Sequence, residues 1–264
     1  MGRAVPLRFS VVVTVRNEER NLAALLDSLV TQEPPLEVVV VDAHSQDRTQ
    51  AIAEDYAEKF ETVRPHVRGG TRGAGRNYGV RKSDGEYVAF IDGDCIASPF
   101  WLKNLRAATA KGDVIAGRTV QIGYEVFEAL ERVELHYRGY DITYPSCNLA
   151  YPRDRFLALC GFDEWFRTAE DIDLNLRAVD AGATIAYEPE AVVYHRTRGS
   201  YYGFLRQAFW NGAGRKQLTL KHGRLWSSYR PRELFHTQAS AAAMARLAGA
   251  LLGYVGYRAF GKRR

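Results

Sequence analysis

The chain has 264 residues, of which 46% are hydrophobic and 25% charged. This balance is typical of a globular protein and excludes a disordered, collagen-like or multi-span membrane chain. Its net charge of +5 is unevenly spread: the segment from Arg196 onward holds 14 of the 36 lysines and arginines and one of the 31 acidic residues, so it favours a polyanionic partner such as nucleic acid, anionic lipid or a phosphorylated substrate.

The first half of the chain alternates short apolar runs with amphipathic stretches. Buried strands are predicted at 9–15, 36–41, 62–67 and 86–91, helices at 18–32, 48–60 and 77–82, and a glycine-rich loop at 69–75. Strands separated by helices indicate a mostly parallel sheet. Ligands of such sheets gather at the carboxyl ends of the strands, and polar clusters lie there at 14–19, 42–47 and 92–94. We therefore expect a nucleotide-binding crevice.

The second half is less regular. Strands are predicted at 113–119, 183–187 and 191–194, an extended segment at 145–151, and helices at 125–137, 154–160 and 171–180. Beyond Gly199 the chain is predicted to form helices rich in aromatic residues and arginines. The expected organisation is a catalytic domain over 1–220 and a basic helical C-terminal extension over 221–264.

Three cysteines without CxxC spacing argue against a disulfide framework or a structural zinc site. Residues 1–8 contain no apolar core of a secretory signal, so a cytoplasmic location is expected. The stretch 239–256 carries a single charge, Arg246, and is long enough for a membrane span, although an arginine in mid-segment is costly in lipid. We favour a helix lying on an anionic membrane surface, with a soluble helix packed on the domain as the alternative.

The motif Asp92-Gly-Asp94 follows the fourth predicted strand directly. Two carboxylates at this spacing can hold a divalent cation together with a diphosphate, because Mg²⁺ and Mn²⁺ prefer oxygen ligands. An isolated acidic triplet is a weak signal, since many such triplets are solvated turns. Its place after a buried strand strengthens the prediction.

The chain resembles the inverting family 2 glycosyltransferases of the GT-A fold. The matching residues are 12–19 (VVTVRNEE), 39–42 (VVVD), 76–79 (RNYG), 85–94 (GEYVAFIDGD), 161–164 (GFDE) and 170–174 (EDIDL). The resemblance implies a Rossmann-like α/β fold with a mostly parallel sheet flanked by helices. It also implies sugar transfer from a UDP- or GDP-sugar, with Mg²⁺ or Mn²⁺, to an acceptor hydroxyl or phosphate.

The resemblance also implies roles for residues of the first half. Thr14 and Arg16 would contact the nucleotide, and Asp42 would face the base or ribose, although an aspartate here can equally cap the following turn. Arg76 would hold the base or diphosphate. Asp92 would touch the ribose or metal, and Asp94 would be the principal metal ligand.

In the second half, Asp171 would be the general base that takes the acceptor proton, with Glu170 as its alternative and Asp173 as a weaker one. Either Glu170 or Asp171 can also simply cap the predicted helix. His195 would complete the metal shell, or else merely end an edge strand. The basic, aromatic segment 204–215 would lie near the diphosphate and acceptor through Arg206, Gln207, Trp210 and Arg215.

Two other functions stay open at this point. A nucleotidyltransferase acting on a sugar phosphate also uses a nucleotide crevice, but the acidic 16–19 segment lacks its glycine- and lysine-rich phosphate loop. A nucleic-acid-binding protein would use the basic segment, but the acidic body disfavours it, and we expect no nucleic-acid partner. The expected acceptor is a glycan or a polyprenyl-phosphate-linked sugar at the inner face of the cell membrane.

Overall fold

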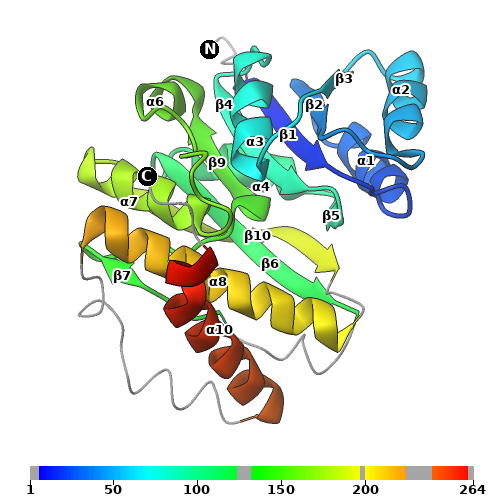
Figure 1. Cartoon of the computed structure of the whole chain (residues 1–264). Coiled ribbons are helices and arrows are strands. Elements are labelled where there is room, and N and C mark those ends of the chain that lie inside the picture. Colours follow the sequence, from blue (N-terminus) through cyan, green and yellow to red (C-terminus); the bar gives the residue numbers. More distant parts are fainter. Residues whose placement is uncertain (1–5, 124–131, 197–199, 224–239, 261–264) are drawn as a thin grey trace.

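A curled, mostly parallel eight-stranded sheet forms the centre of the molecule (Figure 1). The computed structural model describes residues 6–123, 132–196, 200–223 and 240–260. The strand order is β3-β2-β1-β4-β9-β6-β10-β5, in which β9 and β5 run antiparallel to their neighbours. The strands are β1 Phe9–Val15, β2 Leu36–Asp42, β3 Val63–Val67, β4 Tyr87–Asp92, β5 Cys95–Ala97, β6 Val114–Ile122, β9 Leu149–Pro152 and β10 Ile185–Arg196. The predicted α/β class is confirmed.

Helices cover both faces of the sheet. They are α1 Leu22–Val30, α2 Thr49–Lys59, α3 Arg72–Arg81, α4 Trp101–Ala108, α6 Arg153–Ala158 and α7 Glu170–Asp180, with a short 3-10 turn η1 at Ser146–Asn148. Because side chains alternate along a strand, Val11 and Val13 pack with α1 and α4, whereas Val12 packs with α3 and α7 on the other face. This alternation of apolar side chains on both faces explains the continuous valine run of β1.

The glycine-rich segment differs from its prediction as a loop, because α3 already begins at Arg72. Two of its glycines let this helix lie directly on β1. A Cβ at Gly75 would stand 3.0 Å from Thr14 Cγ2, and one at Gly79 would stand 2.5 Å from Val12 Cγ1. The glycines thus serve close helix–sheet packing and bring the N-terminus of α3 to the end of β1.

Three further predictions need correction. The two strands predicted at 183–187 and 191–194 are one strand, β10, whose pairing with β6 shifts register between Glu188 and Val192. Of the helix predicted at 125–137, residues 125–131 lie outside the described residues, and His136–Tyr137 forms strand β7, paired with β8 at Tyr140–Asp141. Helix α1 begins only at Leu22.

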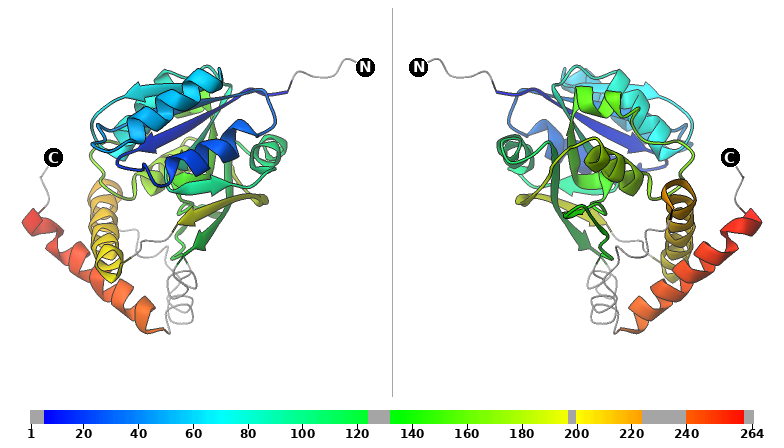
Figure 2. Two further views of the ribbon diagram at one scale, coloured as in Figure 1. Left: turned by 90° about the vertical axis from the view of Figure 1, so that its right-hand side faces the viewer. Right: turned by 90° about the vertical axis from the view of Figure 1, so that its left-hand side faces the viewer.

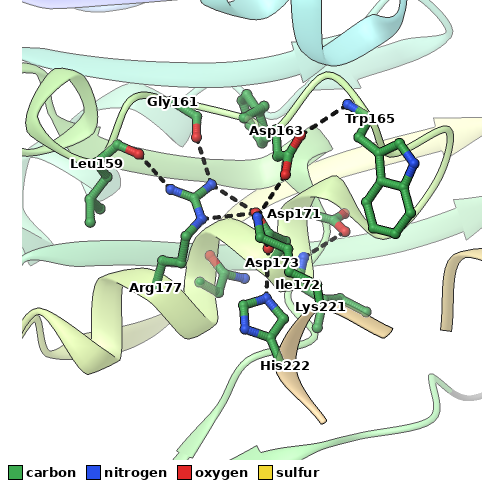
Figure 3. A network of polar contacts seen from close by, with 12 residues as sticks. Leu159, Gly161, Asp163, Trp165, Asp171, Ile172, Asp173, Arg177, Lys221 and His222 are labelled. Carbon is green, nitrogen blue, oxygen red and sulfur yellow. Dashed lines mark hydrogen bonds and ion pairs between the residues drawn. The ribbon is translucent and has the colours of Figure 1, made fainter. Parts of the chain in front are cut away.

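Two long helices, α8 (Tyr201–His222) and α10 (Ala241–Phe260), cross one another beside the sheet domain, with α8 between α10 and the domain (Figure 2). The predicted domain boundary at residue 220 falls inside α8. Close to this boundary, Lys221 and His222 each approach the buried Asp173 of α7 to 2.7 Å (Figure 3). The described part of the chain contains no helix long and apolar enough to cross a lipid bilayer.

Candidate active site

A cavity of about 880 Å³ lies at the carboxyl ends of β1, β2 and β4. This is where the parallel strand order predicts a ligand site, and residues at the ends of all three strands border it. Its walls include residues from the β1, β2 and β4 ends, the start of α3 and one face of α8: Thr14, Arg16, Asn17, Val41, Ala43, Gly70, Thr71, Arg72, Asp92, Asp94, Arg206, Gln207 and Trp210. We call it the nucleotide cavity.

A second cavity of about 400 Å³ adjoins the first. It is lined by η1, the start of α7, the end of β10 and parts of α8 and α10. Both cavities are bordered by the same six residues: Arg72, Asp92, Asp94, Thr168, Gln207 and Asn211. The acidic pair Asp92 and Asp94 therefore stands where two compartments meet, and a molecule in either can reach it.

The nucleotide cavity has polar groups suited to an anionic ligand. Thr14 borders it, and the Oγ1 of this residue is buried without a hydrogen-bond partner among the described residues. Thr71 caps α3 by accepting a hydrogen bond from the Ala74 amide at 3.2 Å, and it borders the cavity with Arg72. Free amides at a helix N-terminus favour phosphate.

Arg76 lies elsewhere than expected. Its side chain is 1% exposed and borders neither cavity, because it is enclosed between two carboxylates. Its guanidinium meets Asp92 at 2.6 Å and Glu170 at 2.9 Å, and it stacks on the Phe162 ring at 5.4 Å. Burial opposes the charge, but the two carboxylates outweigh it and raise the pKa of Arg76. Arg76 thus orients Asp92, and Arg72 is the arginine that borders both cavities.

Asp42 also differs from its expected position. Its carboxylate is buried and accepts hydrogen bonds from the backbone amide and hydroxyl of Ser45, so it closes the turn after β2. Its chain neighbours Val41 and Ala43 border the nucleotide cavity, whereas Asp42 does not. The capping role that the sequence left open is the one observed.

Asp94, Cys95 and His195 could hold a metal ion. The antiparallel pairing of β5 with β10 places Cys95 opposite His195, and their ligand atoms and those of Asp94 lie within 4.8 Å of one another. Asp94 Oδ1 is 3.3 Å from His195 Nε2, while Gln121 holds the other ring nitrogen at 3.2 Å. This contact with the Gln121 side-chain amide fixes the orientation of the imidazole ring.

The electrostatics of this cluster also suit a cation. Although burial opposes it, the hydrogen bond and charge of Asp94, with help from Cys147 and Asp92, raise the pKa of His195 to about 9. The pocket is thus negative enough to hold a proton on the imidazole. A divalent cation would take the place of that proton. By contrast, Asp92 is engaged with Arg76, which together with Arg72 and His195 outweighs burial and lowers its pKa.

The three acidic residues at the start of α7 have different surroundings. Asp171 borders the second cavity, where its carboxylate accepts hydrogen bonds from the amides of Ser146 at 3.1 Å and Ile172 at 2.9 Å. Glu170 also borders it but is buried against Arg76; burial and the Asp171 charge raise the pKa of Glu170. Asp173 is buried inside the Arg177–Lys221–His222 network (Figure 3).

The four residues predicted from the segment 204–215 all lie on helix α8 but border different cavities. Arg206, Gln207 and Trp210 border the nucleotide cavity, whereas Arg215 borders the second cavity alone. Arg167, which the sequence did not single out, stacks over the Trp210 ring at 3.8 Å and borders the nucleotide cavity. Other lining residues that sequence reasoning missed are Arg68, Arg72, Arg132, Thr168, Arg196, Asn211 and Arg246. Arg68 directly precedes the glycine-rich segment 69–75 and Arg72 lies within it, so this segment is the signal that could have found them.

The family model for glycosyl transferase family 2 matches residues 10–154. Among curated proteins, the chain is 26% identical to glycosyltransferase AglE of Haloferax volcanii over 223 residues, which is 79% of this chain and 73% of AglE. It is 29% identical to the pre-mycofactocin glycosyltransferase of Mycobacterium tuberculosis over 231 residues, which is 80% of this chain and 48% of that protein. The chain thus spans about half the length of the second relative.

Solved structures resemble the fold. Staphylococcus aureus TarS 1-349 in complex with UDP-GlcNAc has a TM-score of 0.61 at 22% identity, covering 95% of this chain and 81% of that one. The mannosyltransferase PcManGT of Pyrobaculum calidifontis, solved with GDP-Man and Mn²⁺, has a TM-score of 0.63 at 19% identity, covering 98% of this chain and 77% of that one. At these identities the likeness concerns the fold.

Proposed function

The chain belongs to glycosyl transferase family 2, and we propose that it is a metal-dependent, inverting enzyme that transfers a sugar from a nucleoside-diphosphate donor to an acceptor hydroxyl. One observation carries the proposal: the nucleotide cavity and the second cavity meet at Asp92 and Asp94, and Asp171 borders the second. Donor and acceptor would then approach the reacting carbon from opposite compartments. Membership of this family favours sugar transfer over the nucleotidyltransferase and nucleic-acid-binding alternatives.

The donor would occupy the nucleotide cavity. The complexes of fold relatives with UDP-GlcNAc and GDP-Man support a UDP- or GDP-sugar. Thr14, Arg16, Arg206, Gln207 and Trp210 border this cavity and would contact the donor. The arginines match the diphosphate, since a guanidinium offers paired donors to phosphate oxygens.

Asp94 and His195 would hold Mg²⁺ or Mn²⁺. Asp92, held in place by its ion pair with Arg76, would lie beside the same ion. The Mn²⁺ in the complex of a fold relative supports this assignment, as does the negative surround of His195. Bound there, the cation would offset charge on the leaving diphosphate.

Asp171 would act as the general base. As the acceptor oxygen bonds to the anomeric carbon, its hydroxyl proton passes to the Asp171 carboxylate, and the carbon–oxygen bond to the diphosphate breaks to release the nucleoside diphosphate. A single displacement of this kind inverts the anomeric configuration. Ser146 and Ile172 fix the carboxylate by their amides, and Glu170 is engaged with Arg76, so Asp171 is the preferred base of the two.

We also propose a peripheral location at an anionic membrane surface on the cytoplasmic side, where α10 would contact lipid and a lipid-linked sugar or a glycan would be the acceptor. The outward apolar side chains of α10 and the basic composition beyond Arg196 support this location.

The chemistry is tested by screening UDP- and GDP-sugars for nucleoside diphosphate release with and without Mn²⁺. We expect Asp171→Asn to lose transfer by at least about 100-fold while binding the nucleotide as the parent does, because general-base catalysis contributes about 10²–10⁴-fold. Asp94→Ala should instead weaken nucleotide binding and abolish its Mn²⁺ dependence. Full transfer by Asp171→Asn would exclude it as the base.

A further inference from the structure

The place where the two cavities meet is the place that the transferred sugar would occupy. If the proposed function is right, the donor diphosphate lies in the nucleotide cavity and the attacking hydroxyl in the second cavity, so the sugar stands between them. We call the six described residues that border both cavities the junction: Arg72, Asp92, Asp94, Thr168, Gln207 and Asn211. The chemistry of these six side chains therefore selects the sugar.

Charge at the junction differs from charge on either side of it. Each cavity is bordered by four arginines that do not border the other cavity. Among the six junction residues, by contrast, Arg72 is the only arginine or lysine, and it lies 3.9 Å from Asp92. With Asp94 included, the junction carries one more negative than positive charge, and a divalent cation bound there would be matched by the donor diphosphate. A sugar carboxylate at the junction would thus meet like charge.

The remaining three junction residues offer uncharged hydrogen-bonding groups. Gln207 and Asn211 are four residues apart on α8, so their exposed amides lie on the same face of the helix. Each amide offers both donors and an acceptor. Thr168 Oγ1 donates to the Trp210 carbonyl at 2.6 Å, which orients the lone pairs of this hydroxyl to accept a further hydrogen bond. Sugar hydroxyls, which both donate and accept, match such a set.

We infer that the transferred sugar is uncharged, a hexose or an N-acetylhexosamine rather than a uronic acid, and that Gln207 and Asn211 bind its hydroxyls. The inference rests on the proposed function. A hydroxyl satisfies an amide without a counter-ion, whereas a carboxylate enclosed at the junction would compete with Asp92 for a single guanidinium. Asn211 is therefore a specificity-determining residue that the sequence did not single out.

The inference is tested by equilibrium binding to the full chain with Mg²⁺ and without an acceptor. Titrations with UDP and GDP identify the nucleotide. The neutral probes are then UDP-glucose, UDP-galactose and UDP-N-acetylglucosamine, or GDP-mannose, and the charged probes are UDP-glucuronate or GDP-mannuronate. We expect the tightest neutral probe to bind at least about ten-fold more tightly than the charged probe of the same nucleotide, because a carboxylate without a counter-ion forfeits at least one hydrogen bond's worth of affinity.

Variants of α8 separate the sugar from the nucleotide. Asn211→Ala and Gln207→Ala should each weaken the neutral nucleotide sugar about five- to ten-fold, the value of one or two hydrogen bonds, and leave UDP or GDP binding unchanged. Asn211→Lys adds a cation to the junction and should shift the preference toward the uronate probe by about ten-fold or more.

Two control variants show that the effect belongs to the junction. Arg206→Gln alters a residue that borders the nucleotide cavity alone, so it should weaken the nucleotide and the nucleotide sugar by the same factor. Gln50→Ala removes an exposed amide of α2 that borders neither cavity and should change no titration. Circular dichroism of each variant separates lost binding from lost folding.

Two results would overturn the inference while leaving the proposed function intact, because the nucleotide still binds in both. One is a uronate probe that binds as tightly as the best neutral probe. The other is an Asn211→Ala variant that changes the affinities for the nucleotide and the nucleotide sugar by the same factor, or changes neither. Failure of UDP, GDP and all their sugars to bind would instead contradict the proposed function, and the inference with it.

Discussion

Asp173 is a carboxylate whose charge stabilises the fold. It is fully buried, and Arg177, Lys221 and His222 approach it to between 2.7 and 2.8 Å. Burial opposes the charge, but the His222 hydrogen bond and the neighbouring cations lower the pKa of Asp173 to about 2 from 3.8. A depressed pKa means that the stabilisation, about 2 kcal/mol, is complete above pH 3.8 and is lost as the pH falls toward 2.

We therefore expect Asp173→Asn to lower the free energy of unfolding at pH 7 by about 3 kcal/mol, because Arg177 and Lys221 lose their counter-ion and His222 loses its hydrogen-bond partner. The difference from the parent should shrink as the pH approaches 2. Urea unfolding at several pH values measures both effects. Asp84→Asn, which removes a 60% exposed partner of Arg64, is the control and should change stability by less than about 1 kcal/mol. A difference for Asp173→Asn that is independent of pH would contradict this account.

Arg76 and Arg72 provide a second test at the residue scale, because we assign them different roles. Arg76 positions two carboxylates, whereas Arg72 would contact the nucleotide. Arg76→Gln leaves the buried carboxylate of Glu170 without its cation and removes the closest cation of Asp92, so we expect it to destabilise the protein by about 3–5 kcal/mol. Arg72 is half-exposed and 3.9 Å from Asp92, so Arg72→Gln should leave stability nearly unchanged and weaken nucleotide binding about ten-fold. Unfolding and nucleotide titrations distinguish the two. If Arg76→Gln lost nucleotide binding but kept its stability, Arg76 would contact the donor directly, as the sequence predicted.

Among the secondary-structure elements, the crossing of α8 and α10 depends on missing side chains. A Cβ at Gly212 would stand 1.8 Å from the Ala250 carbonyl oxygen, and one at Gly253 would stand 1.8 Å from that of Phe209. The backbones are therefore in contact, as glycine allows. Arg246 of α10 borders the second cavity. The packing of α10 on α8 therefore also fixes the position of the cavity wall that Arg246 forms.

Gly253→Ala should force the two helices apart. We expect a loss of about 1–3 kcal/mol and faster tryptic cleavage after Arg246, because backbone atoms cannot yield to the methyl group. Gly256→Ala is the matched control: its Cβ would lie 3.7 Å from the Phe209 ring, so the higher helix propensity of alanine should leave stability equal or raised by up to about 1 kcal/mol. Thermal unfolding and timed proteolysis measure the pair. Equal behaviour of both variants would mean that α10 is not held at this crossing.

The elements also mark how far sequence reasoning reaches. Strand β1 has its predicted bounds of 9–15, because a run of β-branched residues is a local signal. Arg76 could not be placed in this way: its partner Glu170 lies 94 residues away, and only tertiary packing shows that the two are buried together. The same holds for His195, which reaches Asp94 through the pairing of β10 with β5. Motif order therefore predicts the edge of the sheet at which the site forms, whereas long-range partners decide which side chains face the cavities.

Viewed as a whole, the molecule has a sheet domain with a crossed pair of helices on one side (Figures 1 and 2). Helix α10 is the outer one, and its exposed side chains are apolar: Met244, Leu251, Leu252 and Val255 are 59%, 53%, 68% and 74% exposed. The chain beyond Arg196 is strongly basic. An apolar helix face accompanied by positive charge matches the interface of an anionic bilayer.

We therefore expect the protein to float with vesicles of phosphatidylcholine and phosphatidylserine and to remain unbound with phosphatidylcholine alone. Binding should fall as salt is raised, because exposed charges are screened over about 10 Å at 0.1 M ionic strength. The double variant Leu251→Gln, Val255→Gln should bind about ten-fold more weakly, since it removes apolar surface that would enter the lipid. Phe100→Ser, which removes a 64% exposed ring on the sheet domain, should bind as the parent does. Flotation that is indifferent to phosphatidylserine, or equal loss in both variants, would exclude α10 as the membrane contact and leave the second cavity to a water-borne acceptor.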